Sequence, residues 1–302
     1  MSLFKPYKYK PRPDLLSDAP VKHGFFVFWE ILFRKFWRFV TVNIFYFAIT
    51  LPMLIYFYTV CNILYYTLLE SRGLLEPLMQ ASPVVDIFPG VAFFSVIRTY
   101  IPQFLHIPLF ALSVFLYGPA TMGMTYIFRN FAREEHAWMS DFVSRGWANF
   151  KQGLFFGILD VVMVLLLASG MIGGVQSGSG VIPIFSIILR TLSGIVLVVY
   201  LFMRHYFYLM AVTVELSVFK IIRNALLFVI IGFGRNILSA LVTLLAFVVC
   251  FLTVPLFSLF TLPFIFYSFS WFATVFICYP VIKKHIVVPA LERERKQESG
   301  DD

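Results

Sequence analysis

Long apolar runs separated by short polar segments make up most of the chain. The runs cover residues 39–69, 101–128, 154–172, 181–203 and 237–282. A helix needs roughly 20 apolar residues to cross the hydrocarbon of a bilayer, so each of the first four runs is long enough for one crossing. The last run is too long for one, and Pro255 and Pro263 flank a short SLFTL stretch near its centre. We expect two spans joined by a tight turn there, which gives an all-α protein with about six transmembrane helices.

Three polar segments repeat their apolar residues with the period of a helix, at residues 22–38, 138–152 and 218–226. In the first, the apolar side is expected to hold Phe26, Trp29, Phe33, Phe36 and Val40. In the second, it is Met139, Phe142, Val143, Gly146 and Phe150. In the third, it is Val218, Phe219, Ile222 and Leu226. Such amphipathic helices are typical of segments that lie in the membrane interface, so we expect three interfacial helices.

The positions of the basic residues predict how the chain threads through the membrane. Of the 24 Lys and Arg residues, only Arg72, Arg98 and Arg190 lie outside the segments that would then face the cytoplasm. Basic residues favour the cytoplasmic side, so both chain ends are expected there. The resulting division has a basic tail at 1–21, an interfacial helix at 22–38 and a six-span domain at 39–285. That domain has an outer loop at 70–100, cytoplasmic loops at 129–152 and 204–236, and is followed by a charged tail at 286–302.

The composition excludes a soluble globular domain, because 60% of the residues are hydrophobic, 13% are charged and the mean hydropathy is +0.85. The net charge of +8 is explained by positive loops beside apolar spans, so no nucleic-acid partner is expected. Cys61, Cys250 and Cys278 all lie in apolar runs without ligand spacing, which argues against a disulfide framework or a zinc site. The polar, proline-rich start lacks the apolar core of a signal peptide.

Two ionisable residues are expected deep within spans. Asp160 in the third span and Arg190 in the fourth both approach mid-depth at 1.5 Å per residue. Charged groups at such depth are costly and usually face the interior of a helix bundle. Asp160 and Arg190 therefore form a hypothetical intramembrane pair, which is either a structural ion pair between adjacent helices or part of a polar pathway or ligand contact.

The sequence lacks the motifs of the common catalytic and cofactor sites. The five histidines are scattered, and the run Glu134-Glu135-His136 is interpreted as a solvated helix end. Gly232-Phe233-Gly234 belongs to an apolar helix and is interpreted as a packing or bending site. We therefore expect no enzyme, no cofactor and no catalytic or metal-binding residues.

The amphipathic segments on the cytoplasmic side offer a second kind of site, a face for partner proteins. Its expected residues are aromatic or basic, and they are Trp138, Arg145, Trp147, Lys151, Lys220 and Arg223. Aromatic and basic side chains at such helices serve equally well to anchor a helix on the bilayer, so membrane anchoring remains the alternative.

Three stretches carry a resemblance to a known family. They are RKFWRFVTVNIFYFAITLPML at 34–54, GPATMGMTYIFR at 118–129 and DFVSRGWANFKQGL at 141–154. The chain resembles the YesL-like family of bacterial membrane proteins, which is a domain of unknown function. That resemblance implies a place in the bacterial cytoplasmic membrane. Because members are often encoded beside carbohydrate ABC importers, it also implies an accessory or regulatory role with such an importer.

Two other functions stay open beside that expectation. One is an autonomous channel or secondary transporter for a small solute, although the few deep polar residues, Asn43, Asn62, Asp160 and Arg190, argue against a wide aqueous pathway. The other is a membrane sensor or assembly scaffold. The expected partners are the lipid bilayer and, in the first case, the permease or other membrane subunits of an ABC transporter.

Overall fold

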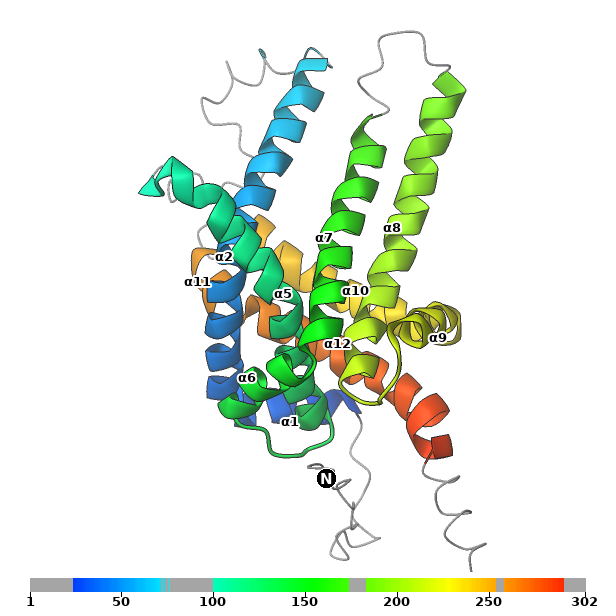
Figure 1. Ribbon diagram of the computed structural model, residues 1–302. Helices are drawn as coiled ribbons and strands as arrows, with labels where there is room; N and C mark the ends of the chain where they lie inside the picture. Colours follow the sequence, from blue (N-terminus) through cyan, green and yellow to red (C-terminus); the bar gives the residue numbers. More distant parts are fainter. Residues whose placement is uncertain are drawn as a thin grey trace, which may run out of the picture.

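The computed structural model describes residues 24–71, 73, 76, 100–173, 183–253 and 258–290. The tail at 1–21, nearly all of the loop at 70–100 and the end of the chain after Ala290 lie outside this part, as does the side chain of Asn62. Throughout the described part, every regular element is a helix (Figure 1).

Six helices are long and apolar enough to cross a membrane, as expected. They are α2 (Phe36–Ser71), α5 (Gln103–Ala132), α7 (Phe150–Gly173), α8 (Pro183–Ala211), α10 (Phe233–Phe247) and α12 (Tyr267–Ile282). Wider π-helical turns extend the last two helices. One, at Val248–Thr253, follows α10, and two, at Leu262–Phe266 and Lys283–Val287, precede and follow α12. The short helix α11 (Ser258–Thr261) lies in the chain between the fifth and sixth spans. The protein is a multi-pass membrane protein whose surface contacts the lipid bilayer.

Neighbouring spans along the chain pack side by side, and α12 lies at the centre of the bundle. α5 packs between α2 and α7, and α7 packs against α8. α12 contacts α10, α5, α2 and α8. In the most apolar stretch of the sixth span, 56% is buried within the protein, against 11% in the corresponding stretch of the fifth span. The sixth span is therefore the most deeply buried of the six, and it contacts four of the others.

Close contact between α5 and α7 depends on glycine. A Cβ atom on Gly118 would lie 1.8 Å from the carbonyl oxygen of Gly153 and 3.0 Å from the Cα atom of Gly157. Gly123 is equally restricted, because a Cβ atom there would lie 2.2 Å from the carbonyl oxygen of Phe142 in α6 (Met139–Ala148). Small residues let helix backbones approach closely in membranes, where dispersion contacts replace the hydrophobic effect between helices.

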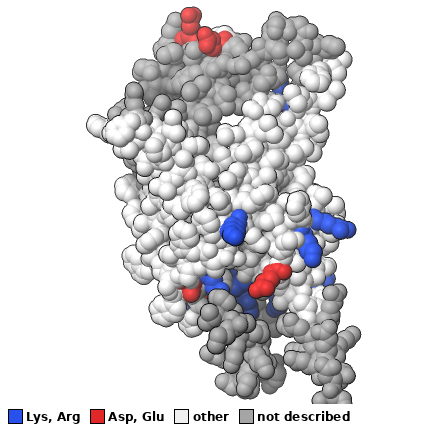
Figure 2. Space-filling model, in the orientation of Figure 1, with Lys and Arg blue, Asp and Glu red and all other residues white. Residues whose placement is uncertain are grey.

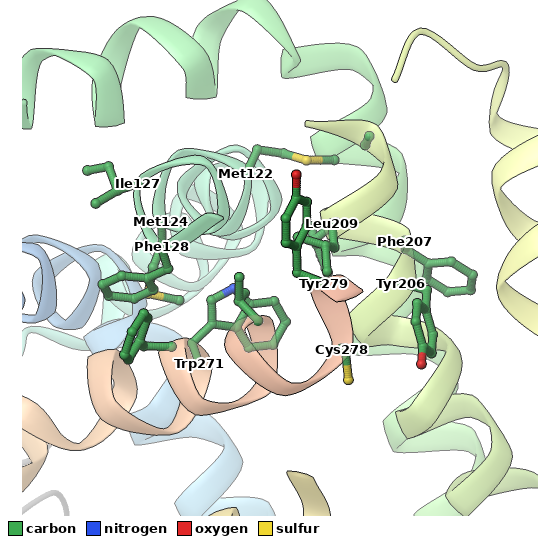
Figure 3. Packing of buried hydrophobic residues seen from close by; sticks show 14 of the residues in the cluster. Met122, Met124, Ile127, Phe128, Tyr206, Phe207, Leu209, Trp271, Cys278 and Tyr279 are labelled. Atoms are coloured by element: carbon green, nitrogen blue, oxygen red, sulfur yellow. The ribbon is translucent and has the colours of Figure 1, made fainter. Parts of the chain in front are cut away.

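The core is rich in aromatic rings. Phe39, Phe128 and Phe272 come from α2, α5 and α12 and are fully buried, with ring centroids 5.1 Å apart for the first two and 4.9 Å for Phe39 and Phe272. Figure 3 shows part of the core from close by, with Met124 and Phe128 of α5 near Trp271 of α12. Offset and edge-on ring pairs stabilise beyond the area they bury, so this contact joins three spans.

The three amphipathic segments all contain short helices, but only one buries part of the predicted face. α6 buries Phe142 and Gly146 as expected and leaves the predicted Val143 48% exposed. In contrast, α1 (Gly24–Arg34) buries Ile31 and Leu32 and leaves the predicted Phe26 and Phe33 exposed. α9 (Val218–Ile231) likewise buries Ile221, Ala225 and Phe228 and leaves Phe219 86% exposed. In a nearly apolar helix, periodicity cannot distinguish the face that meets protein from the face that meets lipid.

The charged residues gather at one end of the molecule. In Figure 2 a broad belt of uncharged side chains separates them from the few charged groups at the other end. We call the charge-rich end, which holds α1, α6 and the last turns of α12, the basic end (Figure 1). Both described termini lie at it. The assignment of this end to the cytoplasm stays a prediction from the basic residues.

Arg129 and Arg204, both expected in cytoplasmic loops, lie inside the long helices α5 and α8 instead. α5 continues through Pro108 and Pro119 to Ala132, so Arg129 is in its last turn and only 8% exposed. Its Nη1 donates a hydrogen bond to the carbonyl oxygen of Val212. α8 similarly continues to Ala211 and contains Arg204. Both helices can carry an arginine inward because the protein supplies acceptors for it.

Candidate intramembrane polar site

Asp160 of α7 is the centre of a buried polar cluster. Its side chain is 3% exposed and its Oδ2 lies 2.7 Å from Nε of Arg204. Three tyrosine hydroxyls donate hydrogen bonds to the carboxylate, from Tyr200 at 2.5 Å, Tyr208 at 2.7 Å and Tyr117 at 3.5 Å. We call these five residues the Asp160 cluster. Its carboxylate has a cation and several donors, which is the condition under which a charge persists inside a membrane.

The helical repeat of α8 explains why the partners converge. Tyr200, Arg204 and Tyr208 are spaced by four residues, so they lie in one stripe along the helix. α7 packs against this side of α8, and Asp160 meets all three side chains. Tyr117 reaches the same point from α5, which packs against α7 through the glycine contact.

Aromatic rings also surround the guanidinium of Arg204. Its Cζ atom lies 4.8 Å from the ring centroid of Trp271, 5.6 Å from that of Tyr208 and 5.9 Å from that of Tyr117. Nη2 donates to the Tyr117 hydroxyl. Such cation–π contacts are strongest where water is excluded, so Trp271 of the central α12 helps to hold the charge.

The predicted partner of Asp160 is therefore wrong: Arg204 occupies the place expected for Arg190. Arg190 is 14 positions earlier on α8, about 21 Å along the helix axis. Its Nε atom is buried without a hydrogen-bond partner in the described structure. Counting depth from the ends of the apolar runs misplaced the pair, because it assigned Arg204 to a loop. The i, i+4, i+8 pattern of Tyr200, Arg204 and Tyr208 is the signal in the sequence that would have located it.

Asn43, another deep polar residue, joins two spans and does not face a pathway. Its Nδ2 donates to the carbonyl oxygen of Leu262 at 2.8 Å, and its Oδ1 accepts from the backbone N–H of Ser268 at 2.8 Å. The amide is fully buried. Both of its ends are used in fixing α2 to the start of the sixth span, so Asn43 has a structural role.

A cavity of about 360 Å³ adjoins the Asp160 cluster. All six spans contribute to its wall, which combines aromatic and aliphatic side chains with polar ones. The polar or charged wall residues are Tyr46, Thr50, Tyr117, Asp160, Arg204, His205, Thr243, Tyr267, Ser270, Trp271 and Thr274. Its size and mixed lining are those of a small-molecule site.

Two polar atoms of the wall have no partner within the described structure. They are Nδ1 of His205 on α8 and Oγ of Ser270 on α12, and both atoms are buried. A buried polar atom without a hydrogen bond costs about 1–3 kcal/mol, so such atoms usually meet water or a ligand. The pairing of Asp160 with Arg204 cancels two opposite charges beside them. This arrangement offers hydrogen-bonding groups to a small polar molecule without offering a net charge.

The residues expected to form one docking face are all exposed, but they occupy two surfaces. Trp138, Arg145 and Trp147 belong to α6 or its start, Lys151 opens α7, and Lys220 and Arg223 lie on α9. α6 packs mainly on α5 and α9 mainly on α8, and Figure 1 shows them on opposite sides of the bundle.

The α6 surface is already organised by contacts within the chain. The guanidinium of Arg38 lies 5.0 Å from the Trp138 ring centroid and that of Arg145 lies 4.8 Å from the Tyr126 ring centroid. Trp147 stacks on Phe150 at 5.1 Å. These contacts hold the aromatic and basic groups at fixed positions beside the bilayer.

Comparison of the chain with protein-family models, with curated proteins and with solved structures gave no match in any of the three.

Proposed function

We propose that this protein binds a small polar solute in the cavity at the centre of its six spans and takes part, without catalysis, in moving that solute across the membrane. The observation that carries the proposal is the pair of unpartnered buried atoms, His205 Nδ1 and Ser270 Oγ, in a 360 Å³ cavity beside the Asp160 cluster. A closed structural core would satisfy such groups within the protein. A solute site leaves them for the solute.

The shape of the site supports a binding site in preference to a wide pore. Tyr117, Tyr267 and Trp271 contribute large rings to the wall, and the cavity is of small-molecule size. A water-filled channel for larger solutes needs a continuous polar lining. The proposal therefore corresponds to a secondary transporter, or a receptor subunit of one, and the solute is one that makes several hydrogen bonds.

Thermal unfolding in detergent tests the binding step. Purified protein is heated with each of a panel of neutral sugars, polyols and amino acids, and Ser270→Leu is compared with wild type because it fills the cavity and removes one unpartnered hydroxyl. Ser169→Leu on the exposed side of α7 is the matched control. We expect a solute that raises the Tm of wild type and Ser169→Leu, since a ligand that binds only the folded state stabilises it, and no such rise in Ser270→Leu.

The outcome that counts against the proposal is equally clear. If no member of the panel raises the wild-type Tm, or if the same solutes stabilise Ser270→Leu as much as wild type, the cavity is not a solute site. The second result would place binding elsewhere on the protein.

A second candidate is an accessory role in a carbohydrate ABC importer of the bacterial cytoplasmic membrane. The YesL-like resemblance motivates it, and the fixed aromatic and basic groups on α6 favour it, because Trp and Arg are enriched where partners bind. Purification in mild detergent from native membranes, followed by identification of bound subunits, tests this role. Recovery of importer subunits with wild type but not with Trp147→Ala/Lys151→Ala is expected. Recovery of no membrane subunit would leave the solute-binding role alone.

A further inference from the structure

A second cavity, of about 350 Å³, lies at the junction of α9, α10 and the end of the sixth span. Arg235 reaches it from the first turn of α10, and Lys284 and His285 reach it from the last turns after α12. We call this cavity the basic pocket. It is separate from the central cavity, and no residue lines both.

The backbone around the basic pocket is tightly fixed. A Cβ atom on Gly232 would lie 2.4 Å from the hydroxyl of Tyr206 and 2.9 Å from the carbonyl oxygen of Phe228, so only glycine fits at this corner between α9 and α10. Arg235 is held in turn by a hydrogen bond from its Nη1 to the carbonyl oxygen of Ile277, at 3.0 Å. Gly232 and Arg235 are therefore held in place by contacts within the chain.

The positive charge of the pocket is not balanced within the described structure. Arg235 and Lys284 form no ion pair with any described carboxylate, and Lys283, next to Lys284 in the chain, is a further exposed cation. Arg34, Arg133 and Arg204 differ in this respect, since each has a carboxylate within 4 Å. Cations whose charge no described carboxylate offsets attract an anion.

The side chains next to the pocket are apolar and exposed. Ile231 and Phe233 are more than half exposed, and Ile230 is 72% exposed. In a protein surrounded by lipid, such side chains meet acyl chains. The pocket thus combines a cationic recess at the basic end of the bundle with an adjoining apolar surface, which is the chemistry of one molecule with an anionic head and two hydrocarbon tails.

We propose that the basic pocket binds the phosphate headgroup of an anionic phospholipid from the leaflet at the basic end, with its acyl chains along Ile230 and Phe233. The Arg235 guanidinium and the Lys284 ammonium donate charge-assisted hydrogen bonds to the phosphate oxygens. Basic pockets between spans on the cytoplasmic side recognise such headgroups in general.

Native mass spectrometry of the full chain in detergent tests the assignment with phosphatidylglycerol and phosphatidylcholine as probes. Wild type should retain phosphatidylglycerol in preference to phosphatidylcholine. Arg235→Gln/Lys284→Gln should weaken phosphatidylglycerol binding by roughly tenfold or more, because each cation near an anionic lipid contributes about a fivefold change. Arg34→Gln, which removes one half-exposed charge on α1 elsewhere at the basic end, should bind as wild type does.

Two further measurements distinguish loss of the lipid contact from misfolding, and a lipid from a soluble phosphate compound. Lys284→Gln alone leaves the Arg235 hydrogen bond intact and should still weaken binding several-fold, which separates lost contact from misfolding. Soluble glycerol phosphate, without acyl chains, should not displace the lipid. Equal retention of the two lipids, unchanged binding in the double variant, or displacement by glycerol phosphate would each overturn the assignment to an anionic phospholipid.

Discussion

α8 carries an arginine towards each end of the helix bundle, and the surroundings of the two side chains differ. Arg204, near the basic end, has a carboxylate, a tyrosine hydroxyl and three aromatic rings around it. Arg190, towards the opposite end of the same helix, has a buried Nε atom without a partner in the described structure. A charged residue in a span therefore becomes the centre of a buried polar cluster only where other spans supply its partners.

The side chains of α8 are also more deeply buried at the basic end than at the opposite end. At the basic end, Tyr206, Phe207 and Tyr208 of α8 are fully buried against other helices. At the opposite end of α8, Ile184, Phe185 and Ile187 are each about 60% exposed and would meet lipid. Among the described residues of α8, the basic end is therefore the more deeply packed against other helices, and variants there should have the larger effects.

The largest effect is expected from Asp160→Ala, which leaves Arg204 without a carboxylate partner among the described residues, as Arg190 is. Removing one partner of a buried ion pair costs about 3–5 kcal/mol, because the remaining charge stays buried. Unfolding free energies in bicelles measure the loss. Asp160→Ala/Arg204→Met removes both charges and should recover most of it. A double variant no more stable than the single one would mean that the pair is not the source of the effect.

A smaller effect is expected from Gly118→Ala, which tests the packing side of the comparison. Its new methyl group would meet the backbone of α7 at 1.8 Å, and overpacking of this kind costs about 1–3 kcal/mol. Gly194→Ala at the other end of α7 and α8 is the matched control, because its methyl group would meet only Met171 at an ordinary 3.6 Å. We expect lower stability in the first variant and unchanged or higher stability in the second. Equal effects would contradict the difference in packing.

Arg190→Gln should change the unfolding free energy by less than about 1 kcal/mol, because no acceptor is lost from Nε and a costly intramembrane charge is removed. The same bicelle measurement compares it directly with Asp160→Ala. A loss as large as that of Asp160→Ala would show that Arg190 has a partner of equal importance.

The smallest effect concerns Lys35, between α1 and α2, and appears only at alkaline pH. Burial, followed by the nearby charges of Arg34 and Arg38, lowers the pKa of Lys35 from 10.5 to about 8. The unfolded chain therefore binds this proton more tightly between those values, so wild-type stability should rise with pH across that window. Lys35→Gln should lack this rise and Lys151→Gln should keep it, as measured by Tm against pH. Parallel curves of Tm against pH for wild type and Lys35→Gln would refute the lowered pKa of Lys35 as the cause.

The sequence predicted the number of spans but not which side chains meet. Apolar runs of sufficient length determine the spans, because hydrocarbon requires every backbone group to bond within its own helix. The partner of Asp160 depends instead on how far α8 continues, and Arg204 was assigned to a loop because basic residues normally end a span. Its helix continues because Asp160 and Tyr117 satisfy it from two other spans.

Faces of the short helices were predictable only where polar residues are frequent. α6 contains Asp141, Ser144 and Arg145 opposite its buried Phe142, and two residues of its predicted face, Phe142 and Gly146, are buried, although Val143 is 48% exposed. α1 and α9 are apolar on two sides, one against protein and one exposed, and the pattern alone does not separate them. The central cavity was not predictable, because its wall takes residues from all six spans and depends on their packing.

The most direct test of the central claim is whether water reaches the cavity beside Asp160. Cys61, Cys250 and Cys278 are first replaced, and a single cysteine is then introduced as Ser270→Cys in the cavity wall or as Val162→Cys on the exposed side of α7, two residues from Asp160. A small water-soluble thiol reagent is added to the protein in membranes, since only a hydrated thiol ionises and reacts. If the cavity is hydrated, Ser270→Cys is modified and Val162→Cys is not; an unreactive Ser270→Cys would mean that water does not reach the cavity.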